Sequence, residues 1–132
     1  MLHDAGILIL ARHFPQAYDE VLDLMINEHY LMPLAEQRVL GVNHAEVGAY
    51  LIGLWGLPAV VVESIQYHHN PSESPQGIAG MTATAAVHLA DGFYATSSQH
   101  PAFRDSVMDP ALVNAPWLSG RLESLRSGLS EP

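Results

Sequence analysis

The sequence contains neither cysteine nor lysine, and it has few charged residues. The absence of cysteine excludes a disulfide scaffold, a thiolate metal site and a cysteine nucleophile. Charged residues make up 14% of the 132 residues, whereas roughly 25% is usual for a soluble domain. The formal charge is −9, so the chain offers little positive surface for a phosphate backbone, and we expect no nucleic-acid partner.

Long hydrophobic runs are also absent. The longest uncharged apolar stretch covers residues 47–62, and Pro58 and several glycines interrupt it. A membrane-spanning helix needs about 20 apolar residues, so this stretch is too short. Near the amino terminus, Asp4 stands where a signal peptide has lysine or arginine. We therefore expect no membrane association and a cytoplasmic location.

The pattern that is present is helical almost throughout, with no alternation typical of strands. It predicts an all-α fold, a compact bundle of about six or seven helices in one domain over residues 1–132. The first helix is apolar on all sides, so we expect it to be largely buried. The helices are predicted over residues 2–14, 16–28, 33–41, 43–55, 58–69 and 81–97, with a short one from residue 110 and a last amphipathic one over 118–125.

Two helix starts are marked by specific residues. Asn43 is a good N-cap, and Glu46 lies three residues later, as in a capping box. Asp109 followed by Pro110 is a second start signal. Gly56 and Pro58 end the helix that starts at Asn43.

Six histidine and aspartate residues stand out on otherwise apolar helices or at their ends: His3, Asp4, His44, His68, His69 and Asp91. Imidazole and carboxylate groups together suit Fe, Mn, Zn or Ni, and the interior of a helical bundle is a natural place for such a site. The alternative is structural, because a single histidine on an apolar helix face is more often a hydrogen-bonded core residue. Asp4 and Asp91 could equally cap helices, and His88 is expected to be a core residue.

Three segments carry a family resemblance. The segment LHDAGILIL resembles the HDIGK helix of the HD phosphohydrolase superfamily, and AVHLAD resembles its final aspartate segment. The segment NHAEVGAYLIGLWGLPAVVVESIQYHHNP resembles the central part of the HDOD family, the HD-related output domain. The resemblance covers residues 2 to about 95 and is most specific in the central block.

This resemblance implies an all-helical regulatory domain. HDOD domains occur mostly in bacteria, often as output modules behind response-regulator receivers, and generally without demonstrated catalysis. Active relatives are metal-dependent phosphohydrolases, including the HD-GYP enzymes that cleave cyclic di-GMP. The resemblance implies that His3 and Asp4 are the His-Asp doublet and Asp91 the late aspartate. His44, His68 and His69 align with the histidines that complete a multinuclear centre.

The chain departs from the catalytic pattern in three ways. The superfamily's upstream metal-binding histidine has no counterpart, because the chain begins just before His3. Ile7 replaces the lysine that follows the glycine in HDIGK, and the sequence from Asn70 onward replaces the glutamate and the Gly-Tyr-Pro segment. The helices that normally precede the doublet are also missing. We therefore interpret the chain as the carboxy-terminal part of a domain, either a natural truncation or a fragment.

Two functions are compatible with these observations. The first is a non-catalytic regulatory module that acts by protein–protein interaction with other signalling proteins. The second is a metal-dependent phosphohydrolase acting on a nucleotide or cyclic dinucleotide, in which the six residues bind metal and activate water. We also expect a homo-oligomer, because the helix that begins at Leu2 and the helix over residues 43–55 have apolar faces for another copy to cover.

Overall fold

The structure is a computed structural model that describes residues 2–97, 107–119, 121, 122, 124 and 128. Within these residues it contains seven α-helices, two short 3-10 helices and no strand. The predicted all-α helical bundle of the HD type is therefore confirmed. No helix in this part of the chain is both long and apolar enough to cross a membrane.

The elements follow the predicted order closely. The first half contains the 3-10 helix η1 (Leu2–Asp4) and the helices α1 (Ala5–His13), α2 (Pro15–Asn27), α3 (Met32–Leu40) and α4 (His44–Leu54). The second half contains α5 (Ala59–Gln66), the 3-10 helix η2 (Pro71–Glu73), α6 (Ala83–Ser97) and α7 (Pro110–Val113).

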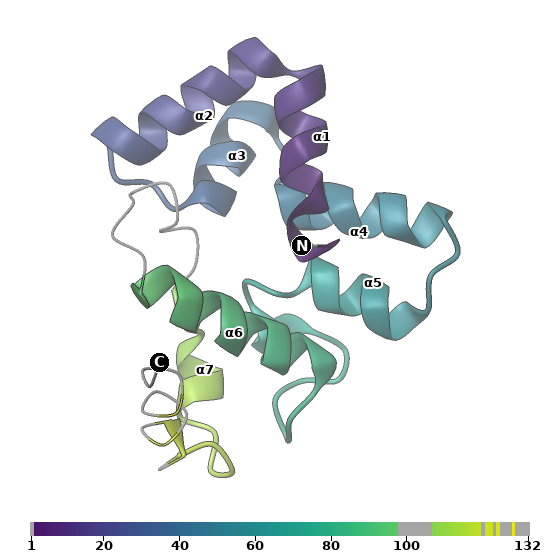
Figure 1. Ribbon diagram of the computed structural model, residues 1–132, viewed down its shortest axis with the longest axis vertical. Coiled ribbons are helices and arrows are strands. Elements are labelled where there is room, and N and C mark those ends of the chain that lie inside the picture. Colours follow the sequence, from purple (N-terminus) through teal and green to yellow (C-terminus); the bar gives the residue numbers. More distant parts are fainter. Residues whose placement is uncertain (1, 98–106, 120, 123, 125–127, 129–132) are drawn as a thin grey trace.

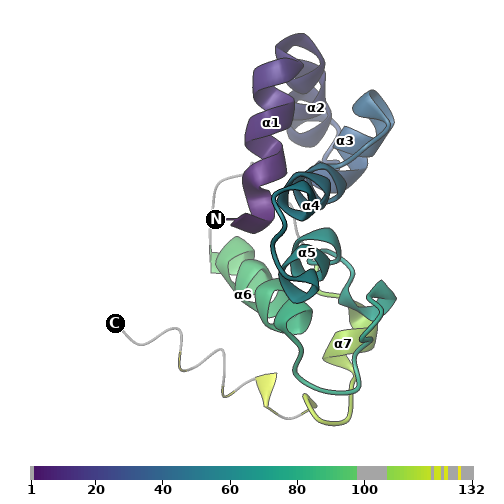
Figure 2. The same cartoon turned by 90° about the vertical axis from the view of Figure 1, so that its right-hand side faces the viewer.

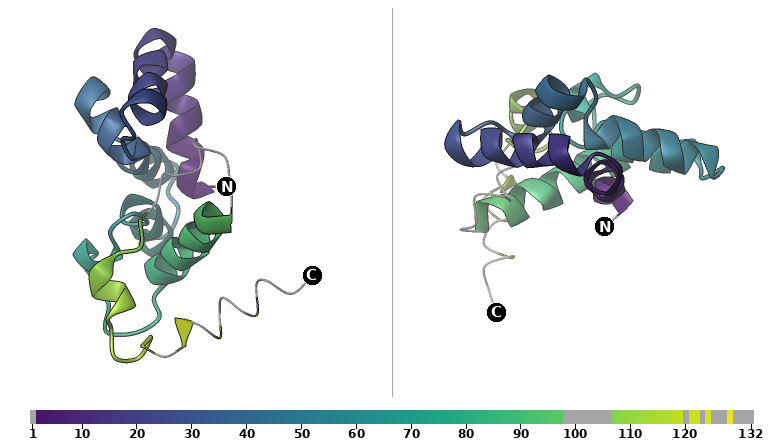
Figure 3. Two further views of the ribbon diagram at one scale, coloured as in Figure 1. Left: turned by 90° about the vertical axis from the view of Figure 1, so that its left-hand side faces the viewer. Right: turned by 90° about the horizontal axis from the view of Figure 1, so that it is seen from above.

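The helices pack in pairs, most of them consecutive in the chain, with α1 and α4 as the exception. Helix α1 packs on α4, α2 on α3, α4 on α5, and α5 on α6. Figure 1 shows α1, α2 and α3 in the upper part of the molecule, α4 and α5 across the middle, and α6 and α7 below. The side view in Figure 2 shows the same order along the long axis. In the left view of Figure 3, the amino terminus lies beside α6, far from it in sequence.

The buried apolar residues form three small cores. One joins α1, α2 and α3 around Leu10, Val21 and Ala35. The second joins α4 and α5 around Ile52 and Ile65. The third joins α6 to the segment around α7. Each core is too small to hold the molecule together alone, so the side chains between the cores decide how the three parts are joined.

The predicted helix starts agree with the structure. The Asn43 side chain accepts a hydrogen bond from the Glu46 backbone N–H, and the Glu46 carboxylate accepts one from the Asn43 backbone N–H. Asp109 caps α7 by accepting a hydrogen bond from the Ala111 backbone N–H. The capping box makes His44 the first residue of α4, and its Nε2 lies 3.5 Å from Asp4 Oδ1.

The structure corrects two of the helix predictions and covers a third only in part. Helix α1 is not largely buried: only Gly6 and Leu10 are, while Leu8 is 75% exposed, because α1 lies at one side of the molecule. Helix α5 ends at Gln66, so His68 and His69 lie in the turn after it. Of the helix predicted over residues 118–125, residues 118, 119 and 121 belong to a turn and residues 122 and 124 are helical, while residues 120, 123 and 125 lie outside the described residues.

Candidate functional site

All six sequence-predicted residues come together at the junction of η1, α4, α5 and α6. His3 and Asp4 come from η1, His44 from the first turn of α4, His68 and His69 from the turn after α5, and Asp91 from α6. We call these residues the His/Asp cluster. Two sets of three potential ligand atoms lie within 4.8 Å of one another, and His68 belongs to both. The sets are His44, His68 and His69, and His3, Asp4 and His68.

The outer part of the cluster contains its two carboxylates. His3 Nε2 lies 3.2 Å from Asp4 Oδ2 and 3.4 Å from Asp91 Oδ1. The contacts with Asp4 and then Asp91 outweigh partial burial and raise the pKa of His3 to about 9. Burial alone raises the pKa of the Asp4 carboxyl, but the contacts with His3 and His68 outweigh it and hold that pKa far below its ordinary value. Asp4 is therefore ionised at neutral pH.

The inner part of the cluster is a group of three packed imidazoles. The His68 and His69 rings have centroids 4.0 Å apart, and His69 Nε2 lies 2.9 Å from His44 Nε2. His44 and His68 are fully buried. Burial, followed by the neighbouring rings of His68 and His44, lowers the pKa of His69 to about 2. His69 is therefore neutral at physiological pH and has a lone pair available for a ligand.

Hydrogen bonds at the opposite ring nitrogens orient the two buried histidines. His44 Nδ1 lies 2.6 Å from Glu36 Oε2, and His68 Nδ1 lies 2.6 Å from the Ile65 carbonyl oxygen. A carbonyl oxygen can only accept, so His68 Nδ1 carries the hydrogen and its Nε2 has the lone pair when the ring is neutral. His68 Nε2 lies 3.6 Å from Asp4 Oδ1, and His44 Nε2 lies 3.5 Å from the same oxygen.

The cluster also leaves several of its buried nitrogen and oxygen atoms without a hydrogen-bond partner. Buried atoms without a hydrogen-bond partner include Nε2 of His3 and His68, Oδ1 of Asp4 and Oδ2 of Asp91. Native proteins seldom leave such atoms unsatisfied, and a cation between them removes the penalty. Imidazole nitrogens and carboxylate oxygens are suitable ligands for divalent transition metals. The residues present fit a metal of this kind.

The sequence interpretation missed Glu36 and Tyr18, which lie behind the cluster. Glu36 is 0% exposed on α3, and it accepts a hydrogen bond from the Tyr18 hydroxyl of α2. A signal was available, because Glu36 lies four residues after Met32 on the same buried face of the helix. Buried acidic side chains are almost always paired, so this position indicates a partner.

His88 is a hydrogen-bonded core residue, as expected. Its Nδ1 lies 2.6 Å from the His68 carbonyl oxygen, and its Nε2 accepts a hydrogen bond from the Asp109 backbone N–H. Burial lowers its pKa, which favours the neutral ring that can make both contacts. His88 thus connects α6 to the turn that carries His68 and His69.

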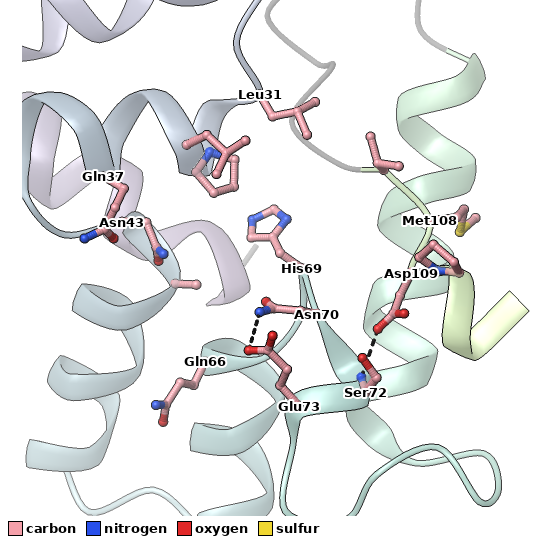
Figure 4. Close-up of a pocket in the computed structure, with 15 residues that line it drawn as sticks. Leu31, Gln37, Asn43, Gln66, His69, Asn70, Ser72, Glu73, Met108 and Asp109 are labelled. Carbon is pink, nitrogen blue, oxygen red and sulfur yellow. Dashed lines mark hydrogen bonds between the residues drawn. The ribbon is translucent and has the colours of Figure 1, made fainter.

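A pocket of about 490 Å³ lies on the side of the cluster where His69 is found. Figure 4 shows His69 among the lining side chains, with Asn43 and Gln37 on one side and Met108 and Asp109 on the other. The described lining includes the carboxylates of Glu73 and Asp109 and no arginine. The polar part of the described pocket lining is therefore neutral or acidic, and it contains no lysine or arginine that would bind an anion.

Comparison with known families identifies the chain. The family model of the HDOD domain matches residues 1–71, just over half of the sequence. The chain belongs to the HDOD family. Its family assignment makes it a signalling-associated, HD-related domain. The matched range contains every cluster residue except Asp91, which the tertiary structure brings in from α6.

One curated relative is an uncharacterized protein of Treponema pallidum (strain Nichols). It is 26% identical to this HDOD chain over 86 residues, which is 65% of the chain and 17% of the relative. The match thus spans under a fifth of that protein's length. No solved structure matches the chain.

Proposed function

We propose that this HDOD chain is a non-catalytic regulatory module that holds a divalent transition metal in the His/Asp cluster. It acts by contact with other signalling proteins. The support for a metal is the set of unsatisfied buried nitrogen and oxygen atoms that the cluster brings together. The residues that would hold the ion are His3, Asp4, His44, His68, His69 and Asp91. Such an ion supplies Lewis acidity and charge compensation for the buried carboxylates.

The lack of arginine among the described contacts of the cluster and the lining of the adjacent pocket supports a role without phosphoester turnover. Phosphoryl chemistry depends on cationic groups that stabilise the transferred charge. In the described residues the cluster's own contacts and the adjacent pocket include no arginine. Arg12 lies on α1, eight residues after Asp4 of η1, which is about 12 Å at the rise of an α-helix. The carboxylates of Asp4, Asp91, Glu73 and Asp109 instead repel an anionic substrate.

A second candidate is a metal-dependent phosphohydrolase that acts on a nucleotide or cyclic dinucleotide. The observation that favours it is the convergence of all six side chains on one place, from η1, α4, the turn after α5 and α6. In this case the six side chains of the cluster hold metal as they do in the first proposal. The two candidates therefore share a metal requirement and differ in turnover.

Metal content and turnover, measured on the same samples, separate these functions. We expect elemental analysis of the purified protein to find a transition metal, and Asp4→Ala to lose most of it. The matched control is Asp19→Ala, which removes an exposed aspartate from α2 and should keep the metal. With added manganese, we expect no hydrolysis of cyclic di-GMP or simple phosphoesters.

The possible results have different consequences. Turnover that disappears in Asp4→Ala but persists in Asp19→Ala would establish the phosphohydrolase and overturn the first proposal. Equal metal content in wild type and Asp4→Ala would show that the cluster is not the binding site.

A further inference from the structure

Glu36 is a buried carboxylate whose contacts include no lysine or arginine among the described residues. Its Oε1 accepts a hydrogen bond from the Tyr18 hydroxyl at 2.9 Å. Its Oε2 accepts one from the His44 backbone N–H at 2.8 Å and lies 2.6 Å from His44 Nδ1. Both carboxylate oxygens therefore have hydrogen-bond partners, and His44 makes two of the three contacts.

This arrangement determines which nitrogen of His44 carries the hydrogen. A carboxylate only accepts hydrogen bonds, so the short contact requires a hydrogen on Nδ1. In the neutral ring, the lone pair is then on Nε2. That nitrogen lies 2.9 Å from His69 Nε2 and 3.5 Å from Asp4 Oδ1, inside the cluster.

Tyr18 in turn restricts Glu36. A buried carboxylate is stable only when its oxygens have hydrogen-bond donors. The Tyr18 hydroxyl satisfies the oxygen that His44 does not reach, and Tyr18 is itself only 6% exposed. The three residues form a connected series from α2 through α3 to α4, ending at the cluster.

We propose that Glu36, held in place by Tyr18, is a positioning residue for the His/Asp cluster. It keeps His44 in the Nδ1–H tautomer, so that the Nε2 lone pair faces the cluster, where it would be available to a metal. A carboxylate behind a metal-binding histidine also makes the imidazole a stronger ligand, and its loss typically lowers metal affinity 10- to 100-fold. The proposal rests on the metal site proposed above and assigns a role to two residues outside it.

A purely structural role is the competing explanation. Glu36 also accepts a hydrogen bond from the first backbone N–H of α4, so its removal weakens the start of that helix. The test therefore needs a control at the same helix end. Glu46 provides one, because its carboxylate caps α4 through the Asn43 backbone N–H and is exposed.

The first measurement is the tautomer of His44 in the metal-free protein at mildly alkaline pH, from long-range ¹H–¹⁵N NMR spectra of the histidine rings. We expect the Nδ1–H form in wild type and in Glu46→Gln. Glu36→Gln keeps the shape of the side chain but offers both a donor and an acceptor, so we expect a mixture of tautomers. The second measurement is a titration with Co²⁺ followed by its visible absorption. We expect affinity to fall 10- to 100-fold in Glu36→Gln, less in Tyr18→Phe, and not at all in Glu46→Gln.

Each result has a stated consequence. A wild-type His44 in the Nε2–H form overturns the proposal without any variant, so the test does not depend on whether Glu36→Gln folds. A Glu36→Gln protein with unchanged tautomer and Co²⁺ affinity overturns it as well. If wild type shows the Nδ1–H form but binds no Co²⁺, the proposed metal site is wrong, while the tautomer assignment to Glu36 is supported.

Discussion

Three buried histidines have the same contact at one ring nitrogen and different surroundings at the other. Nδ1 of His44, His68 and His88 lies 2.6 Å from an oxygen of Glu36, Ile65 and His68, respectively. Nε2 of His88 accepts a hydrogen bond from the Asp109 backbone N–H, so that ring is satisfied. Nε2 of His44 and His68 faces the cluster instead. A histidine whose Nε2 already accepts a hydrogen bond is therefore structural, whereas one whose Nε2 faces the cluster is a candidate metal ligand.

Asp109 gives a testable pH dependence at the residue scale. Burial alone raises its pKa, but hydrogen bonds from Ser72 and Ala111 outweigh burial and lower the pKa below 3.8. The stabilisation is therefore complete above the unfolded-state pKa near 3.8 and is lost as the pH falls through the folded-state pKa. We expect Asp109→Asn to lower the free energy of unfolding by about 1 kcal/mol at neutral pH.

The measurement is urea unfolding of wild type and Asp109→Asn at several pH values from neutral down to about 3. The difference between the two proteins should shrink as the pH falls below about 4. His88 is the titratable neighbour on α6, and because it is present in both proteins its own protonation largely cancels. Asp19→Asn, at an exposed position of α2, should match wild type throughout. A difference that stays constant with pH would contradict the assignment.

At the scale of elements, a close crossing of α1 and α4 brings Asp4 against His44. A Cβ atom on Gly6 would overlap the backbone carbonyl of His44, and one on Gly48 would lie 3.3 Å from the Gly6 backbone nitrogen. The two helices can approach this closely only because both positions lack a side chain. This approach holds η1, and with it His3 and Asp4, beside the first turn of α4.

Gly6→Ala tests this crossing. The new methyl group has no flexible side chain to displace, so the helices must move apart. We expect the free energy of unfolding to fall by at least about 2 kcal/mol, as for overpacked cores. Gly53→Ala is the control within α4, since its Cβ would meet only Val62 atoms at 3.9 Å. It should be neutral or stabilising by up to about 1 kcal/mol. Equal effects of the two substitutions in thermal or urea unfolding would rule out the close crossing.

At the scale of the whole molecule, large apolar side chains remain exposed on α1 and at the end of α4. Leu8 is 75% exposed, Tyr50 72%, Leu54 67% and Trp55 66%. Tyr50 and Leu54 are four residues apart on α4 and therefore share a face. Adjacent exposed apolar side chains of this size are typical of an interaction surface.

We predict that two copies of the chain associate through the exposed face of α4 that carries Tyr50 and Leu54. Light scattering at micromolar concentration should show an oligomer for wild type. Leu54→Glu should weaken the association at least about tenfold, because it places a charge in the apolar contact. Ile26→Glu, at a 57% exposed position of α2, should leave the association unchanged. A well-folded wild-type monomer at this concentration would exclude the homo-oligomer.

The helices and their starts were predictable from the sequence because their signals are local. The capping box of Asn43 and Glu46 and the cap at Asp109 depend on residues two or three positions apart. The six cluster residues were also singled out, since histidine and aspartate are conspicuous on apolar helices. The exposure of α1 was not predicted, because an apolar sequence does not specify which neighbours cover it.

The sequence by itself determined the helical fold, the family and a set of residues with the chemistry for a metal site. Only the tertiary structure decided that these residues meet, since the junction joins positions as distant as His3 and Asp91. It also decided the roles of Glu36 and Tyr18, which follow from burial and from hydrogen bonds between α2, α3 and α4. The physical reason is that helix signals act over a few residues. The orientation of an imidazole instead depends on the group at its far nitrogen, which the fold supplies from elsewhere in the chain.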